Sequence, residues 1–359
     1  KGESFLKRHM MMCEEAQGGE TKKKKQRKGI QVVMLLENRV SLMSVSLLNP
    51  SIEPIGNLNA DGADISKIFH CDGLFLCITN DKDKKLLVWN PYLGQTRWIE
   101  PRNSYHRFDR YALGYDKRKK EHKVLRFVDN FDQSTKPELE IYSLNSNSWK
   151  FVVDDFSPDW TTSHGQRGLS LKGNTYWYAH EKKHPISGAR KIKDLADFLI
   201  CFDFETERFG PRLSLPFHAY GLDTVTLSSV REEQVAVLFQ RRISPAYTLK
   251  IWISSKIEPD AVSWNSDLFL TVDMKPLIGV QFDYYAGSFF VDEEEKVAVV
   301  LHKDKGKPDP NKHNTAYIIA SNGYLKLVDL GQSRDFRHGP LVCSYVPSSV
   351  PIDSNLLHH

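Results

Sequence analysis

The feature that most constrains this chain is a unit of four short apolar strands that recurs about every 50 residues. In the clearest copy, YALGY is followed by a charged turn, KVLRFV, a longer loop, LEIYSL, a short turn and WKFVV. Aromatic residues at matching third-strand positions, Trp89, Tyr142, Phe202 and Trp252, lie 53, 60 and 50 residues apart. Four-stranded units of this length are typical of the blades of a β-propeller.

Four further copies keep the same order of strands, and they occupy residues 66–101, 167–213, 224–272 and 287–330. In the copy at 224–272 we expect WNSDLFLTV to be the outer strand. The strands read as near-continuous apolar runs, as expected where both faces of each sheet pack against neighbouring blades.

Ring closure follows from the strands that remain. Three of them, at about 31–36, 39–47 and 52–58, precede the first full unit, and one, at about 341–346, follows the last. Joining the last strand to the early three makes a sixth blade and removes the open sheet edges. We therefore predict an all-β, six-bladed propeller of four-stranded blades, closed by the C-terminal strand in the N-terminal blade.

Composition and charge narrow the class of protein. Apolar residues make up 40% and charged residues 26% of 359 residues, which is ordinary for a globular chain. No apolar run approaches 18 residues, and no secretory signal is visible, so we expect a soluble intracellular protein of the nucleus, the cytoplasm or both, with no membrane partner. The five cysteines are widely spaced and odd in number, which predicts reduced thiols.

The net charge of +4 is concentrated at the start of the chain. Residues 1–30 hold nine Lys or Arg and four Asp or Glu, which leaves the rest near −1. Nucleic acid is therefore not an expected partner. We divide the chain into a flexible basic leader (1–29), the propeller (30–352) and a tail (353–359).

The stretch LLVWNPYLGQTRWIEPR places two tryptophans nine residues apart. In the repeat, Trp89 ends a third strand, the segment from Asn90 to Gly94 makes a turn, and Trp98 belongs to the outer strand. We expect both indoles to be packed within or between blades and not offered to a ligand.

An ordered series of segments resembles the associated interaction domain of plant F-box proteins, which have kelch-like propellers behind an F-box. The series includes CDGLFLCIT, LLVWNPYLGQTRWIEPR, YALGYD, RGLSLKGNTYWYA, FLICFDFETERFGPRLSLPF and, near the end, VDLG followed by CSYVPS. The likeness covers about 30–352. It implies a substrate-receptor subunit of an SCF-type (cullin-RING) ubiquitin ligase, in which the F-box binds a Skp-family adaptor and the propeller captures a target.

The sequence departs from that family pattern at its start. Only ESFLKRHMMM resembles the end of an F-box, the leading helices are missing, and the chain begins with Lys1. We expect a fragment, or a product without its F-box, so that the adaptor and the cullin are partners of the parent protein and not of this chain alone.

Residue patterns that would indicate an enzyme are weak along the chain. Gly-rich phosphate loops are absent. His70, Cys71 and Cys77 do not have a common zinc spacing, so we expect strand residues there and no metal or other cofactor. Ser163 and His164 adjoin in a loop without a third orienting group. We predict a non-catalytic chain; a propeller enzyme remains the less favoured alternative.

Two segments are candidate interaction sites. The basic block Lys22, Lys23, Lys24, Lys25, Arg27 and Lys28 is a candidate nuclear import signal, with a solvated linker as the alternative. Loops between second and third strands, and connections between blades, emerge on one face of a propeller. Aromatic and arginine side chains on such a rim suit protein recognition, and our candidates are Arg107, Phe108, Trp160, Arg241, Arg242 and Tyr247.

The sequence therefore favours a protein-recognition module from a ubiquitin-ligase substrate receptor, with a protein target of unknown identity. An adaptor-free scaffold or decoy that binds targets without delivering them is the second hypothesis. For each candidate binding residue, packing within the ring is the alternative role.

Overall fold

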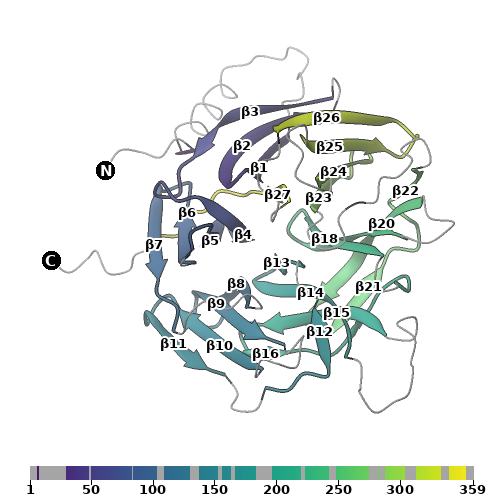
Figure 1. Cartoon of the computed structure of the whole chain (residues 1–359). Coiled ribbons are helices and arrows are strands. Elements are labelled where there is room, and N and C mark those ends of the chain that lie inside the picture. Colours follow the sequence, from purple (N-terminus) through teal and green to yellow (C-terminus); the bar gives the residue numbers. More distant parts are fainter. Residues whose placement is uncertain are drawn as a thin grey trace, which may run out of the picture.

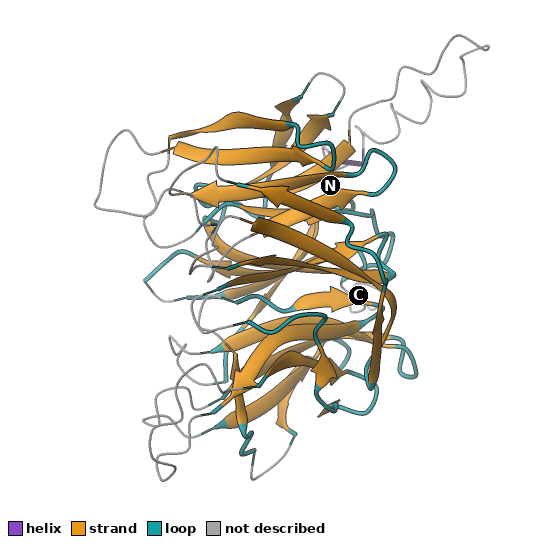
Figure 2. Cartoon of the chain, turned by 90° about the vertical axis from the view of Figure 1, so that its right-hand side faces the viewer, coloured by secondary structure: helices purple, strands orange, loops and turns teal. Residues whose placement is uncertain are grey.

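A computed structural model places the strands in six small antiparallel sheets arranged as a ring, which confirms the predicted six-bladed propeller (Figure 1). The structure describes residues 6–7, 30–47, 50–82, 84–102, 109–129, 137–152, 156–162, 166–182, 196–219, 223–241, 248–274, 282, 288–303, 313–332 and 339–352. Figure 2 shows the ring from its side, with the strands running across the disc.

Blades 1 to 3 each have four strands, ordered from the channel outward. Blade 1 contains β27 (Leu341–Ser344), β1 (Ile30–Leu36), β2 (Arg39–Ser46) and β3 (Ser51–Leu58). Blade 2 contains β4 (Ile65–Cys71), β5 (Leu74–Thr79), β6 (Leu86–Asn90) and β7 (Gln95–Ile99). Blade 3 contains β8 (Arg110–Asp116), β9 (Glu121–Val128), β10 (Glu138–Ser143) and β11 (Ser148–Phe151).

Blades 4 to 6 keep the same plan with local interruptions. Blade 4 contains β12 (Trp160–Thr162), β13 (Leu169–Leu171), β14 (Asn174–Glu181), β15 (Asp197–Asp203), β16 (Arg208–Phe209) and β17 (Leu213–Ser214). Blade 5 contains β18 (Thr224–Val230), β19 (Gln234–Gln240), β20 (Thr248–Glu258), β21 (Ala261–Trp264) and β22 (Leu270–Asp273). Blade 6 contains β23 (Ser288–Asp292), β24 (Val297–Lys303), β25 (His313–Ala320) and β26 (Leu325–Gln332).

Ring closure occurs where the sequence predicted it. β27 pairs antiparallel with β1, from Leu341 opposite Leu35 to Ser344 opposite Val32. Six apolar clusters of described residues lie between neighbouring blades, one at each of the six interfaces. Middle strands are buried on both faces because a blade packs on each side, and all residues of β5, β6 and β9 are buried.

The outer strand of blade 5 differs from the prediction. WNSDLFLTV is not one strand, because β20 is eleven residues long and has two successive partners. β21 pairs with its second half after a tight turn, and β22 returns to pair with its first half. Within the expected segment, Trp264 ends β21, and residues 270–272 lie in β22.

The two tryptophans of the LLVWNPYLGQTRWIEPR stretch have different environments. Trp89 is 2% exposed between blades 1 and 2, as predicted. Trp98 is 40% exposed, so the prediction that it is packed inside was wrong. Trp98 lies on the outermost strand next to the buried Ile99, and alternation along a strand turns its side chain to the opposite face. Its indole N–H donates to Asp61 Oδ2 at 3.0 Å.

We call the side of the ring with the first-to-second-strand turns the hairpin face, and the opposite side the loop face. After β27, the chain continues across the hairpin face, and Tyr345, Ser348 and Ile352 are buried there. Ile352 joins the apolar cluster between blades 2 and 3. Within the predicted leader the structure describes Leu6 and Lys7, and Leu6 is buried in the cluster between blades 1 and 2.

Asn90 fixes this C-terminal segment to blade 2. Its side-chain amide donates to the backbone oxygens of Ser348 and Val350, each at 2.9 Å, and its Oδ1 accepts from Leu93 N at 3.0 Å. Asn90 itself has no exposed surface; its hydrogen bond to Ser348 is buried, and those with Val350 and Leu93 are partly buried.

Asn90→Ala is expected to lower the free energy of unfolding by about 1–3 kcal/mol, because two backbone oxygens and one backbone N–H, all buried or partly buried, lose their partner. Urea unfolding measures the loss, and faster amide exchange in residues 345–352 would report release of the segment. Asn57→Ala is the control, since Asn57 is exposed and is hydrogen-bonded only to Ser41 Oγ in the described contacts; its expected effect is below about 0.5 kcal/mol. Equal losses for the two variants would contradict the role of Asn90.

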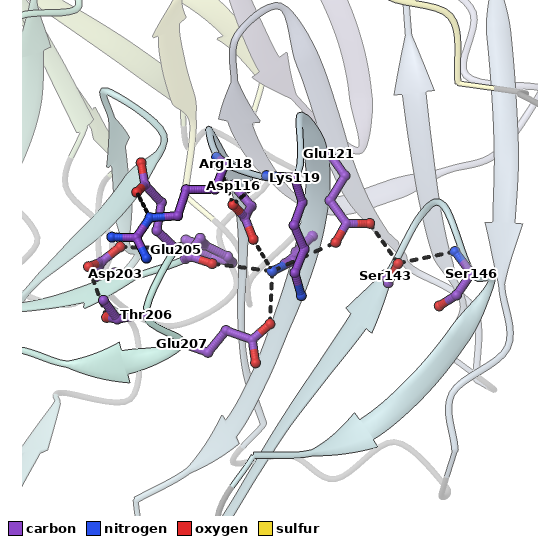
Figure 3. A network of polar contacts seen from close by, with 12 residues as sticks. Asp116, Arg118, Lys119, Glu121, Ser143, Ser146, Asp203, Glu205, Thr206 and Glu207 are labelled. Carbon is purple, nitrogen blue, oxygen red and sulfur yellow. Dashed lines mark hydrogen bonds and ion pairs between the residues drawn. The ribbon is translucent and has the colours of Figure 1, made fainter.

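A buried ion network joins blades 3 and 4 on the hairpin face. Lys123 of β9 is 1% exposed, and its Nζ contacts the carboxylates of Asp116 and Glu207 and the backbone oxygen of Phe204. The Glu207 contact is 2.8 Å, and Glu121 Oε1 lies 3.7 Å away. Figure 3 shows Asp116, Glu121 and Glu207 converging on one nitrogen.

Candidate partner-binding surface

The predicted binding residues fall partly outside the described structure. Arg107, Phe108, Arg242 and Tyr247 lie outside the described residues, as does the basic block Lys22 to Lys28. Trp160 and Arg241 are described. Both lie toward the loop face, because β12 begins there and Arg241 directly follows β19, which ends there.

Trp160 is only 6% exposed and is surrounded by other rings. Its ring centroid lies 4.8 Å from that of Phe209, 6.2 Å from that of Phe127 and 6.4 Å from that of Phe156. Little of its indole is therefore available to a partner in this conformation. Arg241 is half-buried, and its guanidinium lies 5.9 Å from the ring of Phe239.

The structure also brings together four cations that the sequence did not single out. Lys67 of β4 lies among Arg167, Arg110 and Lys84, with Asp109 as the nearby acid. Burial lowers the pKa of Lys67 first, and the three cations add to this, so that its pKa is about 8. We call Lys67, Lys84, Arg110 and Arg167 the basic cluster. It draws on blades 2, 3 and 4.

A chain of buried hydrogen bonds orients Arg110. Its Nε donates to Thr162 Oγ1 at 3.1 Å, and its Nη2 donates to the Thr162 backbone oxygen at 3.4 Å. Thr162 is held in turn by Asp129, whose Oδ2 accepts from the Thr162 backbone N at 2.9 Å and from Thr162 Oγ1 at 3.0 Å. These hydrogen bonds fix the guanidinium between blades 3 and 4.

Arg167 connects the basic cluster to a cavity of about 90 Å³ in the central channel. The lining is rich in hydroxyl groups, contributed by Ser170, Thr226, Ser228, Ser229, Ser288 and Ser344. Ser229 and Ser344 are hydrogen-bonded across the channel at 3.0 Å between their Oγ atoms. This volume is well below the roughly 300 Å³ at which small-molecule sites begin, and it suits a few water molecules or one short side chain.

The trio His70, Cys71 and Cys77 is not assembled into one site. Cys77 packs between blades 1 and 2, whereas Cys71 packs between blades 2 and 3. His70 Nε2 accepts a hydrogen bond from the backbone N of Gly73 at 3.0 Å. The described cysteines, Cys71, Cys77, Cys201 and Cys343, are all free thiols.

Sequence reasoning missed the basic cluster because its members are isolated charges, 43 and 57 residues apart between Lys67, Arg110 and Arg167. The one available signal was that each lies in or just before the first strand of a repeat. First strands line the axis of a propeller, so a charge there in three consecutive units converges on the centre of the ring.

Comparison with known proteins agrees with this architecture. Residues 31–352 match the model of the F-box associated beta propeller domain. The chain belongs to the F-box associated β-propeller family. The F-box/kelch-repeat protein At3g16740 of Arabidopsis thaliana is 56% identical, over 98% of this chain and 90% of that protein. The F-box proteins At5g42460 and At2g17830 of the same plant are 49% and 47% identical, each over 98% of this chain and 89% of their own length.

Membership in the F-box associated β-propeller family implies a substrate-recognition role. In the described part of this family member, no helix is both long and apolar enough to cross a membrane.

Proposed function

We propose that this propeller is the target-recognition module of an SCF-type ubiquitin-ligase substrate receptor. The observation that carries the proposal is membership in the F-box associated propeller family over residues 31–352, together with relatives that are named F-box proteins over nearly the same length. In this role the Skp-family adaptor and the cullin bind through an F-box, and the propeller holds the target.

The basic cluster and the loop-face side chains form the target site in this proposal. Lys67 is held where burial and three cations oppose its charge, which costs stability in the free protein. An acidic segment of a target would relieve that cost by pairing with Lys67 and Arg167, while Arg110, which is 4% exposed, adds its positive charge from below the surface. Trp160 and Arg241 on the same face stay predictions for the surrounding contact, as does nuclear import through Lys22 to Lys28.

Lys67→Met is expected to stabilise the protein while weakening target capture. The folded pKa of about 8 lies below the ordinary 10.5, so the penalty on the charged form is complete below pH 8. Between pH 8 and 10.5 the unfolded chain binds the proton more strongly, so wild-type stability gains from rising pH. At pH 7, Lys67→Met should be about 1–3 kcal/mol more stable than the wild type. Its stability should not show the rise with pH that the wild type shows above pH 8. Urea unfolding from pH 7 to 10 measures both differences.

Target capture is the second readout for the same variant. Proteins retained by the wild-type chain from proteasome-inhibited Arabidopsis extract should bind Lys67→Met at least tenfold more weakly. Lys326→Met is the control, because Lys326 is exposed on the outer strand of blade 6 and should change neither property. If Lys67→Met captures these proteins as well as the wild type does, the basic cluster is not part of the target site.

Ligase function needs its own experiment. An F-box from a relative is fused before residue 30, and the fusion is combined with adaptor, cullin, RING protein and a captured target. The proposal expects ubiquitin on the target only when the F-box is present. A target that binds the fusion and the unfused chain, but is ubiquitylated with neither of them, would favour the scaffold or decoy hypothesis.

A further inference from the structure

Three metal-ligating side chains meet on the hairpin face, away from the basic cluster. Cys71 ends β4, Asp72 lies in the following turn, and His122 lies near the start of β9 in the next blade. Cys71 Sγ is 3.6 Å from Asp72 Oδ2, and His122 Nε2 is 3.8 Å from the same oxygen. One ligand atom from each of the three residues lies within 4.8 Å of the other two.

These separations are close to those around a tetrahedral zinc ion. Zinc binds sulfur at about 2.3 Å and nitrogen or oxygen at about 2.0–2.2 Å, so ligand atoms in a tetrahedral site lie roughly 3.3–3.6 Å apart. The sulfur–oxygen and nitrogen–oxygen separations here need to shrink by only a few tenths of an ångström. Thiolate and imidazole ligands favour zinc over magnesium or calcium, which prefer oxygen.

The imidazole of His122 is ready to act as a ligand. The residue is 5% exposed, and among the described residues its Nε2 is buried without a hydrogen-bond partner. An unsatisfied buried nitrogen is unfavourable, and a metal ion would satisfy it.

The surrounding side chains also favour a cation. The Cys71 thiol donates a hydrogen bond to Asp72 Oδ2, so the thiol proton now occupies the side of that carboxylate that a metal ion would take. A second acidic side chain, Glu232 of the blade 5 turn, lies nearby, with an oxygen 3.8 Å from His70 Nδ1. A divalent cation bound to Asp72 would be attracted by both carboxylates.

We propose that Cys71, Asp72 and His122 bind one zinc ion, with water as the fourth ligand. Binding displaces the thiol proton of Cys71 to solvent and forms a zinc–thiolate bond. The ion joins the β4–β5 turn of blade 2 to β9 of blade 3, so its role is to hold neighbouring blades together on the hairpin face. None of the proposed zinc ligands belongs to the proposed target site, so the two proposals can be tested separately.

The test uses the full chain without an affinity tag, after removal of metal by a chelator. Zinc content is measured after dialysis, and Co²⁺ is added as a spectroscopic probe whose thiolate charge-transfer band reports a sulfur ligand. We expect one tightly bound zinc per chain, a charge-transfer band with Co²⁺, and a melting temperature a few degrees higher with zinc.

Asp72→Asn is the most informative variant, because the side chain of Asp72 is 45% exposed and its backbone φ of 48° is one that Asn tolerates. It should fold like the metal-free wild type and bind zinc at least tenfold more weakly. Cys71→Ser should lose the cobalt charge-transfer band. Cys201→Ser, at a buried free thiol in blade 4, should keep both properties.

Three results would overturn the site: a wild-type chain that retains no zinc, a charge-transfer band that survives in Cys71→Ser, or equal zinc affinity in wild type and Asp72→Asn. Because Asp72→Asn changes an exposed turn residue, misfolding does not confound that comparison.

Discussion

Lys123→Ala is expected to lower the free energy of unfolding by about 3–5 kcal/mol, because it leaves carboxylates buried without their cation. Asp116 is 1% exposed like Lys123 itself, and Glu207 is mostly buried. Burial alone would raise the pKa of Asp116, but the hydrogen bond from Lys123 and the backbone N–H groups of Lys119 and Arg118 hold it below its ordinary value. The hydrogen bonds to Asp116 therefore lower its pKa more than burial raises it, and losing the Lys123 partner should destabilise the fold.

The same network offers an internal control for Lys123. Lys150 Nζ lies 2.6 Å from the other Glu207 oxygen, but its side chain is 51% exposed. Lys150→Ala should cost less than about 1 kcal/mol, since water and salt screen an exposed pair. Urea unfolding of both variants at pH 7 measures the contrast. Similar losses for Lys123→Ala and Lys150→Ala would show that burial does not set the strength of this network.

The stability that this network contributes should decrease as the pH falls. The pKa of Glu207, which burial would raise, is also held below its ordinary value by Lys123 and Lys150. A lowered carboxyl pKa contributes stability above the unfolded pKa, and this contribution is lost as pH falls through the folded pKa. The difference between wild type and Lys123→Ala should therefore be largest at neutral pH and should shrink in acid.

Trp160→Ala is expected to lower the free energy of unfolding by about 3–5 kcal/mol, because it leaves a cavity among Phe127, Phe156 and Phe209. Trp98→Ala is the matched control, because Trp98 is 40% exposed on the outermost strand of blade 2. It should cost about 1 kcal/mol or less. Urea unfolding of both variants provides the measurement, and a loss at Trp160 no larger than that at Trp98 would contradict the assigned packing.

The expected instability of Trp160→Ala affects how the binding prediction is tested. Weaker target capture by that variant would report damage to the ring as readily as loss of a contact. Trp160→Phe keeps an aromatic ring in the cluster and removes the indole N–H and part of the edge. A change in capture by Trp160→Phe, with stability close to wild type, would separate recognition from packing.

The blade plan was predictable because each unit repeats the same physical requirement. A strand buried on both faces needs an unbroken apolar run, and β5, β6 and β9 are all such strands. The closing strand was predictable because the remaining strands could complete only one further sheet. The repeat length and the order of strands were therefore enough to predict the number of blades and how the ring closes.

Local failures of the sequence prediction have identifiable causes. The interruption of the blade 5 outer strand depends on a β20 longer than its partners, which apolar patterning does not reveal. The burial of Lys123 and of Arg126, which is paired with Asp109 and Glu140, depends on acids from other strands and another blade. Trp89 and Trp98 were both expected to be packed, but Trp98 lies on the outermost strand, where only one face is covered and alternation turns its side chain outward.

The candidate sites were less predictable than the fold. The basic cluster and the Cys71, Asp72 and His122 group each combine residues from different blades, so neither has a characteristic spacing along the chain. The sequence groups Cys71 with its neighbours His70 and Cys77, whereas the structure places it beside His122, 51 residues away.

Closure by β27 has a consequence for how the propeller is made. β1 is synthesised before the strands of the other five blades, whereas its partner β27 follows all of them. Until β27 is made, β1 presents an unpaired edge with Val32 and Met34, whose cluster between blades 6 and 1 is incomplete. Unpaired edges and exposed apolar surface make incomplete chains prone to aggregation. A chain that stops before Leu341 would therefore form an open ring with an unpaired strand in its first blade.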